Sequence, residues 1–453
     1  MPFPYLTTRL RAALFRPIDI AWLVLFRIGA GVLIATEHLG AVIMGHPQQY
    51  LAARHHFTYL LAPLPDLSAP ALYAFYAATI GAGLAVAAGW HYRLAAAVLT
   101  VGTWWIFLLD STGYINHHYL FCLIAGLLLV LPAHRAASLD GRAGRVTPSP
   151  TAPAWTRYLL LGQVSIVYFF AGLAKLNPDW LAARPLTIWL GHKGNWWLIG
   201  PLLTTAWLPW LMSYAGLLLD LFITPLLLWR RTRPWAYGAA AFFHLSNVAI
   251  FGLGTFPWFS LLMTALFFDP DFPRHLPGAV GRWFRQRVPQ PTAADVITIP
   301  SPLLLRTVVL GLTVYAAVQI AVPLRHFLYP GEVHWTEQGH NFAWHMMLRN
   351  KDSNAQFRVR FAADGHEEVA DLSQLLSPRQ RKFADFPDNL LRVAHWLAED
   401  YRAQGRPLAA VYVDSQVSLN GRPAKPFIAP DVNLLDYEPT LAPAAWLTAA
   451  PPL

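Results

Sequence analysis

Long apolar runs fill most of the first 323 residues of this 453-residue chain. The hydrocarbon core of a bilayer is about 30 Å thick, and a helix of about 20 apolar residues crosses it. Each run is long enough for such a helix, or nearly so, which predicts a chain that crosses the membrane many times. We expect nine spanning helices, of which the eighth is short. They lie at residues 19–44, 69–89, 94–110, 118–132, 155–174, 208–229, 234–251, 255–268 and 303–323.

The composition agrees with lipid as the solvent. Hydrophobic residues make up 55% of the chain and charged residues 13%, whereas soluble domains carry about 25% charged residues. The mean hydropathy is +0.36. We therefore predict an α-helical polytopic membrane protein.

Basic residues predict how the chain is oriented, because short cytoplasmic loops hold an excess of Lys and Arg. The loops with many arginines all fall on one predicted side of the membrane, and the N-terminus is expected there, in the cytoplasm. The formal net charge of +9 is thus mostly a consequence of topology, and no nucleic-acid partner is expected. The arginines are Arg9, Arg11, Arg16, Arg93, Arg135, Arg142, Arg145, Arg157, Arg230, Arg231, Arg233, Arg274, Arg282, Arg285 and Arg287.

Residues 324–453 differ in character from the apolar part. Alternation at 356–361 and 408–414 predicts strands, and 388–402 predicts a helix. We expect two domains, a transmembrane domain at 1–323 and a small extracytoplasmic α+β domain at 324–453 that completes the active site. The segments 292–302 and 442–453 are interpreted as linkers or frayed ends. Cys122 is the sole cysteine, so the chain has no intramolecular disulfide.

One lysine ends an apolar run, in the segment from Tyr168 to Trp180. Lys175 lies there at a predicted membrane boundary, where a charge costs a few kcal/mol unless it is paired, wetted or neutral. Burial favours the neutral amine, which is a base, so Lys175 is a candidate functional residue. The alternative is a lysine that extends to the membrane surface beside a helix-capping Asp179.

A second polar group, Asn116 and His117, lies between the third and fourth runs. Asn116 alternatively caps the helix that follows. His117 and His118 are adjacent, so their side chains point about 100° apart on a helix and make a poor metal pair.

Two more polar groups are expected on the extracytoplasmic side. His244 and Asn247 lie inside the seventh run, where a structural hydrogen bond to a neighbouring helix is the alternative to a functional role. The segment 326–345 contains His326, Trp335 and Trp344, although interfacial tryptophans are common in membrane proteins.

At these positions the chain resembles the vitamin K-dependent γ-glutamyl carboxylases and their bacterial relatives with an HTTM membrane domain. The resemblance runs in the family's order from about residue 20 to residue 365. Its segments are Phe-Leu-Leu-Asp110, Asn116-His117, Tyr119-Leu120, Tyr168 to Trp180, Gly216-Leu-Leu-Leu-Asp220-Leu, Phe243-His244 with Asn247, and Trp344 with Met346-Met347.

The resemblance implies a reaction that removes the γ-proton of a peptidyl glutamate and adds CO2. A lysine amine cannot remove that proton, because its pKa of about 10 is about 15 units too low, which corresponds to about 20 kcal/mol. In the family, the lysine deprotonates a naphthohydroquinone instead. The hydroquinone then reacts with O2 to give a strongly basic alkoxide and ends as an epoxide, so the cofactor carries the hard chemistry.

The resemblance also assigns roles to residues. Lys175 matches the family's base, His117 matches a histidine tied to carboxylation, and Asn116 is a candidate donor to the hydroquinone oxygen. The remaining cofactor-binding candidates are His244, Asn247, Tyr168 and Trp180, and the substrate-binding candidates are His326, Trp335, Trp344 and His192. No metal is expected, because O2 reacts directly with the hydroquinone and no ligand spacing is convincing.

The chain departs from the family at several positions. An arginine that follows the base lysine by about sixteen residues is absent, and His192 or Lys193 is expected to hold its anion. His345 replaces an aspartate of the animal members. Their disulfide between the exported region and the membrane part cannot form. The shorter exported domain predicts looser substrate selection.

We expect a γ-carboxylase of the bacterial inner membrane. Its cofactor would be reduced vitamin K, as phylloquinol or menaquinol, with O2 and CO2 as co-substrates. Its partners would be the lipid bilayer, the quinone, a glutamate-containing peptide and an epoxide-reducing enzyme. Two alternatives are a quinol epoxidase without glutamate carboxylation and a non-catalytic quinone- or lipid-binding module. Lys175 and His117 argue against the module, since a sensor needs no base.

Overall fold

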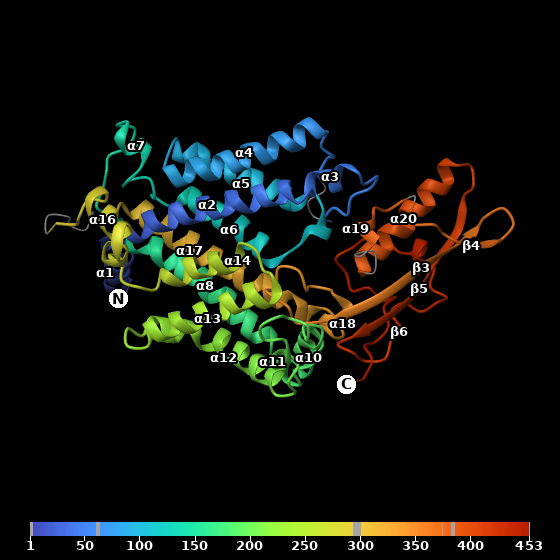
Figure 1. The fold of residues 1–453 in the computed structure, drawn as a ribbon. Helices are drawn as coiled ribbons and strands as arrows, with labels where there is room; N and C mark the ends of the chain where they lie inside the picture. The colour runs from blue at the N-terminus through green and yellow to red at the C-terminus, as the bar shows by residue number, and fades with distance from the viewer. Residues whose placement is uncertain (1–2, 60–63, 293–299, 374, 382–385, 453) are drawn as a thin grey trace.

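The computed structural model describes residues 3–59, 64–292, 300–373, 375–381 and 386–452. A bundle of roughly parallel helices forms one end of the molecule, and a sheet with a covering helix forms the other (Figure 1). The N-terminus lies at the end of the bundle that is farthest from the sheet. The chain is therefore mostly helical, with a small C-terminal sheet region.

The long helices are α1 (Phe3–Phe15), α2 (Ala21–Ile43), α4 (Ala69–Ala88), α5 (Tyr92–Leu108), α6 (Asn116–Val130), α8 (Ala154–Ala174), α12 (Leu208–Leu228), α13 (Arg233–Phe251), α14 (Phe256–Ala265), α16 (Gly278–Arg287), α17 (Pro302–Leu324) and α20 (Pro387–Ala403). The short helices are α3 (His46–Leu51), η1 (Ser111–Gly113), α7 (Leu139–Arg142), α9 (Pro178–Leu181), α10 (Arg184–Gly191), α11 (Gly200–Leu203), α15 (Phe272–His275), η2 (Arg325–Leu328), α18 (Val333–Thr336), α19 (Pro378–Arg381) and η3 (Leu434–Asp436). The strands are β1 (Pro17–Asp19), β2 (Thr151–Pro153), β3 (Lys351–Phe361), β4 (Glu367–Val369), β5 (Leu408–Leu419) and β6 (Lys425–Pro426).

A helix occupies each of the nine positions where the sequence predicts a span. Within the described residues, five of these helices are long and apolar enough to cross a membrane: α2, α4, α8, α12 and α17. Three others, α5, α6 and α14, are apolar but shorter. Helix α13 falls outside both groups, since His244, Ser246 and Asn247 interrupt its apolar run. Five spans are thus supported, and the full set of nine stays a prediction.

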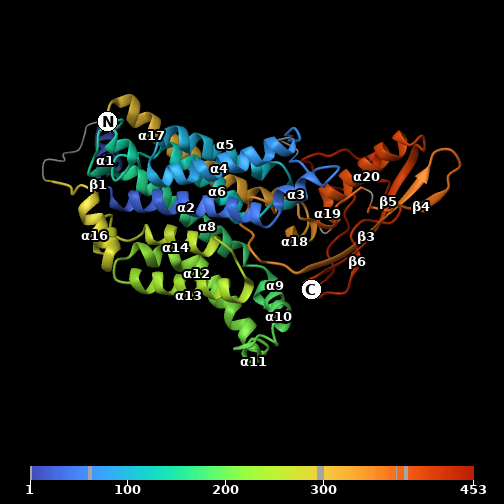
Figure 2. The same ribbon diagram turned by 45° about the horizontal axis from the view of Figure 1, so that its top comes forward.

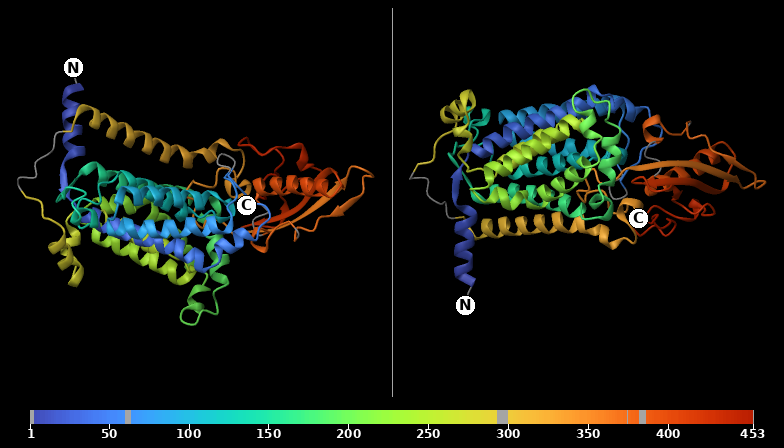
Figure 3. Two further views of the ribbon diagram at one scale, coloured as in Figure 1. Left: turned by 90° about the horizontal axis from the view of Figure 1, so that it is seen from above. Right: turned by 60° about the horizontal axis from the view of Figure 1, so that its bottom comes forward.

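Several helices carry apolar side chains on their outer surface, as expected of surfaces that face lipid. Helix α17 runs along the outside of the bundle (Figure 3), and only 11% of its most apolar window is buried. Exposed residues of α17 include Leu303, Leu310 and Val314, and Leu218 and Phe222 are exposed on α12. Exposed apolar surface of this extent marks a membrane or protein contact. Together with the five apolar helices, it indicates an integral membrane protein.

The arginine-rich segments share one end of the bundle. Helices α7 and α16 and the turn between α12 and α13 lie near the N-terminus and away from the sheet (Figures 1 and 2). This arrangement agrees with the predicted grouping of basic loops. Which side of the membrane each end faces stays a prediction.

The C-terminal region folds around an antiparallel sheet with the strand order β4-β3-β5-β6. Strands β3 and β5 pair along nearly their whole length, with Phe357 opposite Val413 and Val359 opposite Val411. These side chains are buried with Leu390 of α20 in a core separate from that of the helix bundle. Alternation of buried and exposed residues along β3 and β5 is the pattern expected of a sheet with one covered face.

The prediction of a frayed C-terminal tail is wrong for residues 442–452. Trp446 is buried, and Leu447 forms a β-bridge with Ile428. The indole Nε1 of Trp335 donates to the carbonyl oxygen of Thr448 at 2.8 Å. The buried tryptophan, the β-bridge and this hydrogen bond fix the tail despite its many prolines. Of the predicted linker at 292–302, residues 293–299 lie outside the described residues, and Ser301 caps α17.

Candidate active site

A cavity of about 210 Å³ lies among α6, α8, α12, α13 and α14. The ends of these helices that border it point toward the sheet region (Figure 1). Most of its lining is apolar, and Met346 and Met347 contribute to it from the segment before β3. All seven residues predicted for catalysis or cofactor binding line this one cavity. They are Asn116, His117, Tyr168, Lys175, Trp180, His244 and Asn247.

Lys175 follows the last turn of α8 and points into the protein. Its Nζ lies 2.6 Å from Oδ2 of Asp220 on α12 and 3.2 Å from the carbonyl oxygen of Ala171. The Lys175 and Asp220 side chains are each 6% exposed. Its Nζ also lies 5.2 Å from the ring centroid of Trp180, within the range of a cation–π contact when the amine is protonated. Lys175 therefore does not extend to the membrane surface.

The turn that follows Lys175 starts the short helix α9. Gly216 of α12 lies beside Lys175, where an added Cβ would be in ordinary van der Waals contact with the lysine Cε atom at 4.0 Å. The residue that caps α9 is Asn177, whose Oδ1 accepts from the backbone N–H of Trp180 at 2.9 Å. Asp179, the predicted alternative cap, bonds instead to Asn420 and Arg422 of the C-terminal region.

Asp220 belongs to the segment Gly216-Leu-Leu-Leu-Asp220-Leu that carries the family resemblance, but it is not among the residues predicted for the site. The signal that could have found it is its charge, since an acidic residue inside an apolar helix needs a partner. That partner is Lys175, which lies at the C-cap of the neighbouring apolar helix α8. Within the described residues the two charges are each other's ion-pair partner.

Asn116 and His117 begin α6 at the cavity wall. The Oδ1 atom of Asn116 accepts from the Tyr114 hydroxyl at 2.9 Å, and its Nδ2 donates to the carbonyl oxygen of His345 at 2.9 Å. Asn116 thereby fixes the backbone just before the two cavity methionines, and it is not the cap of α6, a position that Ile115 occupies. An amide carries two N–H donors, so one is left for a ligand. The ring of His117 stacks on Phe256 with centroids 5.5 Å apart.

His244 is held by a hydrogen bond between helices. Its Nε2 lies 2.8 Å from the hydroxyl of Tyr168, which also lies 3.1 Å from Oγ1 of Thr264. The Nδ1 atom of His244 is buried and has no hydrogen-bond partner among the residues that the structure describes. A buried polar atom without a partner is costly. Since His244 lines the cavity, a ligand there could supply the missing bond.

The four predicted substrate-binding residues do not line this cavity. His326 lies next to His345, with ring centroids 4.9 Å apart. Trp335 is buried in the core of the C-terminal region, and Trp344 packs on Tyr119 in the core of the bundle. His192 is exposed after α10. A contact of these four residues with substrate stays a prediction.

Two protein-family models match the chain. The HTTM domain model matches residues 15–272, which is more than half of the chain. The model of the lumenal domain of vitamin K-dependent γ-carboxylase matches residues 305–451, so its match begins within α17. No solved structure matches the chain. The two family matches, in this order along one polypeptide, show that the chain belongs to the vitamin K-dependent γ-carboxylase family.

Proposed function

We propose that this protein is an integral-membrane enzyme that converts peptidyl glutamate to γ-carboxyglutamate. It would use CO2, O2 and reduced vitamin K, with epoxidation of the naphthohydroquinone in the same cycle. The observation that carries the proposal is the Lys175–Asp220 pair in the wall of an apolar cavity, 2.6 Å between Nζ and Oδ2. A base in the wall of an apolar cavity is what deprotonation of a bound hydroquinone requires.

The cavity residues suit a fused aromatic ring system. Trp180, Trp189, Phe243 and Phe256 supply aromatic walls, and the methionines supply adaptable ones. Within the described part of the chain, the buried Nδ1 atom of His244 has no hydrogen-bond partner, so it is available to a quinol oxygen. A bound hydroquinone, together with O2, would supply the strong base that the γ-proton of glutamate demands.

The chain's own groups then have separate tasks. Lys175 would accept a proton from a ligand hydroxyl, and Asp220 would stabilise the ammonium that results, as a carboxylate does beside a protonated base. Tyr168 would hold the His244 ring so that Nδ1 faces the ligand. His117 and the second amide hydrogen of Asn116 would serve as polar contacts at the same wall.

The test combines both half-reactions in one assay. Purified, detergent-solubilised protein is supplied with reduced vitamin K, O2, labelled bicarbonate and a short glutamate-rich peptide. We expect vitamin K epoxide and labelled peptide from the wild type, and a loss of at least about 100-fold in both from Lys175→Ala. Lys425→Ala, which removes a surface lysine of β6, is the matched control and should keep both activities.

The outcomes separate the proposal from its alternatives. Full epoxidation by Lys175→Ala would contradict the assigned base. Epoxide without labelled peptide in the wild type, with several peptides, would favour a quinol epoxidase. Neither product, with vitamin K still bound to the protein, would favour a quinone-binding module.

A further inference from the structure

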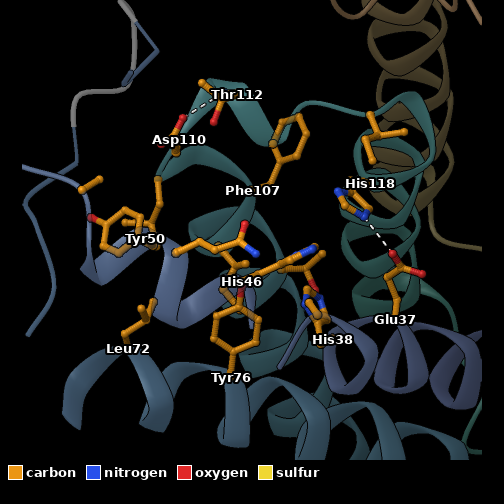
Figure 4. A pocket seen from close by; sticks show the side chains of 18 of the residues that line it. Glu37, His38, His46, Tyr50, Leu72, Tyr76, Phe107, Asp110, Thr112 and His118 are labelled. Atoms are coloured by element: carbon orange, nitrogen blue, oxygen red, sulfur yellow. Dashed lines mark hydrogen bonds and ion pairs between the residues drawn. The ribbon is translucent and has the colours of Figure 1, made fainter. Parts of the chain in front are cut away.

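A second cavity lies beside the first and has a different character. Its volume is about 130 Å³, and α2 to α5, η1 and the start of α6 enclose it. Glu37, His38, His46 and Asp110 are among its polar lining residues, and Ser377 and Gln380 border it from the C-terminal region. Figure 4 shows several of these side chains converging on the cavity.

Three side chains join the two cavities. Glu37 and His118 line the second cavity, whereas His117 lines the first. The Nε2 atom of His118 lies 2.8 Å from Oε1 of Glu37, the contact drawn in Figure 4. The Nε2 atom of His117 lies 3.7 Å from the same oxygen. Neighbouring histidines on a helix diverge, but here both rings reach one carboxylate from α2.

The geometry of these donors is close to that of a metal's first coordination shell. One ligand atom from each residue lies within 4.8 Å of the other two. Bonds of about 2.0–2.2 Å to Zn²⁺ in a tetrahedral site place neighbouring ligand atoms about 3.3–3.6 Å apart. The observed separations of 2.8 and 3.7 Å to Oε1 need shifts below about 1 Å to reach that range.

A hydrogen bond to its other oxygen also orients the Glu37 carboxylate. The hydroxyl of Thr255, from the turn between α13 and α14, donates to Oε2 of Glu37. Oε1 is therefore the oxygen that faces the two histidines. A hydrogen bond that fixes the non-coordinating atom of a ligand group is typical of the surroundings of metal sites.

We propose that Glu37, His117 and His118 bind a divalent first-row transition metal ion, with Zn²⁺ as the reference ion. Two imidazole nitrogens and one carboxylate oxygen form a donor set that Zn²⁺ and Fe²⁺ use with open coordination positions. Mg²⁺ and Ca²⁺ prefer oxygen ligands alone, so they should bind weakly here. The metal site shares His117 with the wall of the first cavity, but the proposal rests on the positions of three side chains and does not require the carboxylase reaction.

The test measures metal binding alone. The full chain, purified in detergent without a polyhistidine tag, is stripped with a chelator and titrated with Co²⁺, whose visible absorption reports nitrogen and oxygen coordination. We expect saturation at one equivalent per chain, displacement by Zn²⁺ and no displacement by equimolar Mg²⁺. Glu37→Gln and His118→Gln should each weaken Co²⁺ binding at least tenfold, since each removes one ligand.

The control is His46→Gln, which changes a histidine of the same cavity outside the three-residue cluster. It should leave Co²⁺ binding unchanged. Failure of the wild type to bind one equivalent would overturn the proposal, and so would binding that Glu37→Gln and His118→Gln leave unchanged. Since the wild-type titration needs no variant, a folding defect in one of them does not remove the test.

Discussion

At the scale of single residues, Asp220 is the ion-pair partner of Lys175. Asp220→Asn keeps the shape of the side chain and removes the charge that faces Nζ at 2.6 Å. Loss of one partner of a buried ion pair costs about 3–5 kcal/mol in stability. We expect at least about 100-fold slower epoxidation, because the ammonium formed during the reaction would have no counter-ion.

The measurement is epoxide formation at saturating vitamin K, alongside thermal unfolding in detergent. Asp269→Asn is the matched control, since Asp269 forms ion pairs with Arg230 and Arg233 and is half exposed. Its loss should cost about 1 kcal/mol or less and leave the rate unchanged. A wild-type rate in Asp220→Asn would reduce Asp220 to a structural role.

Buried histidines of the C-terminal region give the protein a pH-dependent stability. Burial, and after it the charge of Arg349, lower the pKa of His334 to about 4 against a smaller opposing effect of Asp179. The unfolded chain, with a histidine pKa of about 6.5, therefore binds more protons between pH 6.5 and 4. Stability is present above pH 6.5, falls as the pH decreases through this window and levels off below the folded pKa.

His334→Gln tests this dependence, because glutamine does not titrate. Wild-type stability should fall by up to about 3 kcal/mol from this residue between pH 6.5 and 4. Burial also lowers the pKa of His340 and His345, so the variant should lose part of the slope rather than all of it. The melting temperature measured against pH checks the prediction, and exposed His366→Gln should retain the wild-type slope.

A charge within an apolar run is costly, and on this ground the sequence predicts Lys175 as a site residue. Glu37 lies inside the first predicted span and Asp220 inside the sixth, and the same rule applies to both. What the sequence could not supply is the pairing, because Glu37 and His118 are 81 residues apart in the chain and lie on two different helices.

At the scale of elements, the turn between β5 and β6 connects the C-terminal region to the membrane part. Arg422 in this turn forms a buried ion pair with Asp179 of α9, and Asn420 Nδ2 donates to the same carboxylate at 2.7 Å. Arg422 also donates to the carbonyl oxygen of Pro451 at 3.0 Å. This buried network ties the two parts together without a disulfide, since Cys122 is the sole cysteine of the chain.

Arg422→Met should therefore loosen that connection. Removal of the arginine leaves Asp179 buried with weaker partners, which costs about 3–5 kcal/mol. We expect a lower melting temperature and faster proteolytic cleavage of the C-terminal region. Arg406→Met is the control, since Arg406 pairs with Glu368 at the surface and its loss should cost about 1 kcal/mol or less. Equal effects of the two variants would contradict the proposed connection.

Elements differ in how well their sequences predict them. Apolar runs predict the positions of nine helices to within a few residues, because a helix in lipid must satisfy its own backbone hydrogen bonds. The pairing of β1 with β2 was not predicted, since it joins Pro17–Asp19 to Thr151–Pro153 through contacts between distant segments. The tail was interpreted as frayed from its prolines, and burial of Trp446 outweighed that local signal.

At the scale of the whole molecule, the two ends of the helix bundle differ in charge, and the sheet region lies at only one of them. The arginine-rich turns and the N-terminus lie at one end, and the sheet region lies at the other (Figure 1). Since short basic loops stay in the cytoplasm, the sheet region should face the opposite compartment. Both cavities border residues of the C-terminal region, so substrate would reach them from that side.

The single cysteine makes this orientation directly testable. Cys122 is buried, so a thiol introduced at the surface can be labelled without a cysteine-free background. Ala363→Cys adds one at the turn between β3 and β4, and Ala143→Cys adds one after α7 at the other end; both alanines are exposed. A membrane-impermeant maleimide should label Ala363→Cys in intact cells with a permeable outer envelope. It should label Ala143→Cys only after the inner membrane is opened, and the reverse pattern would invert the predicted topology.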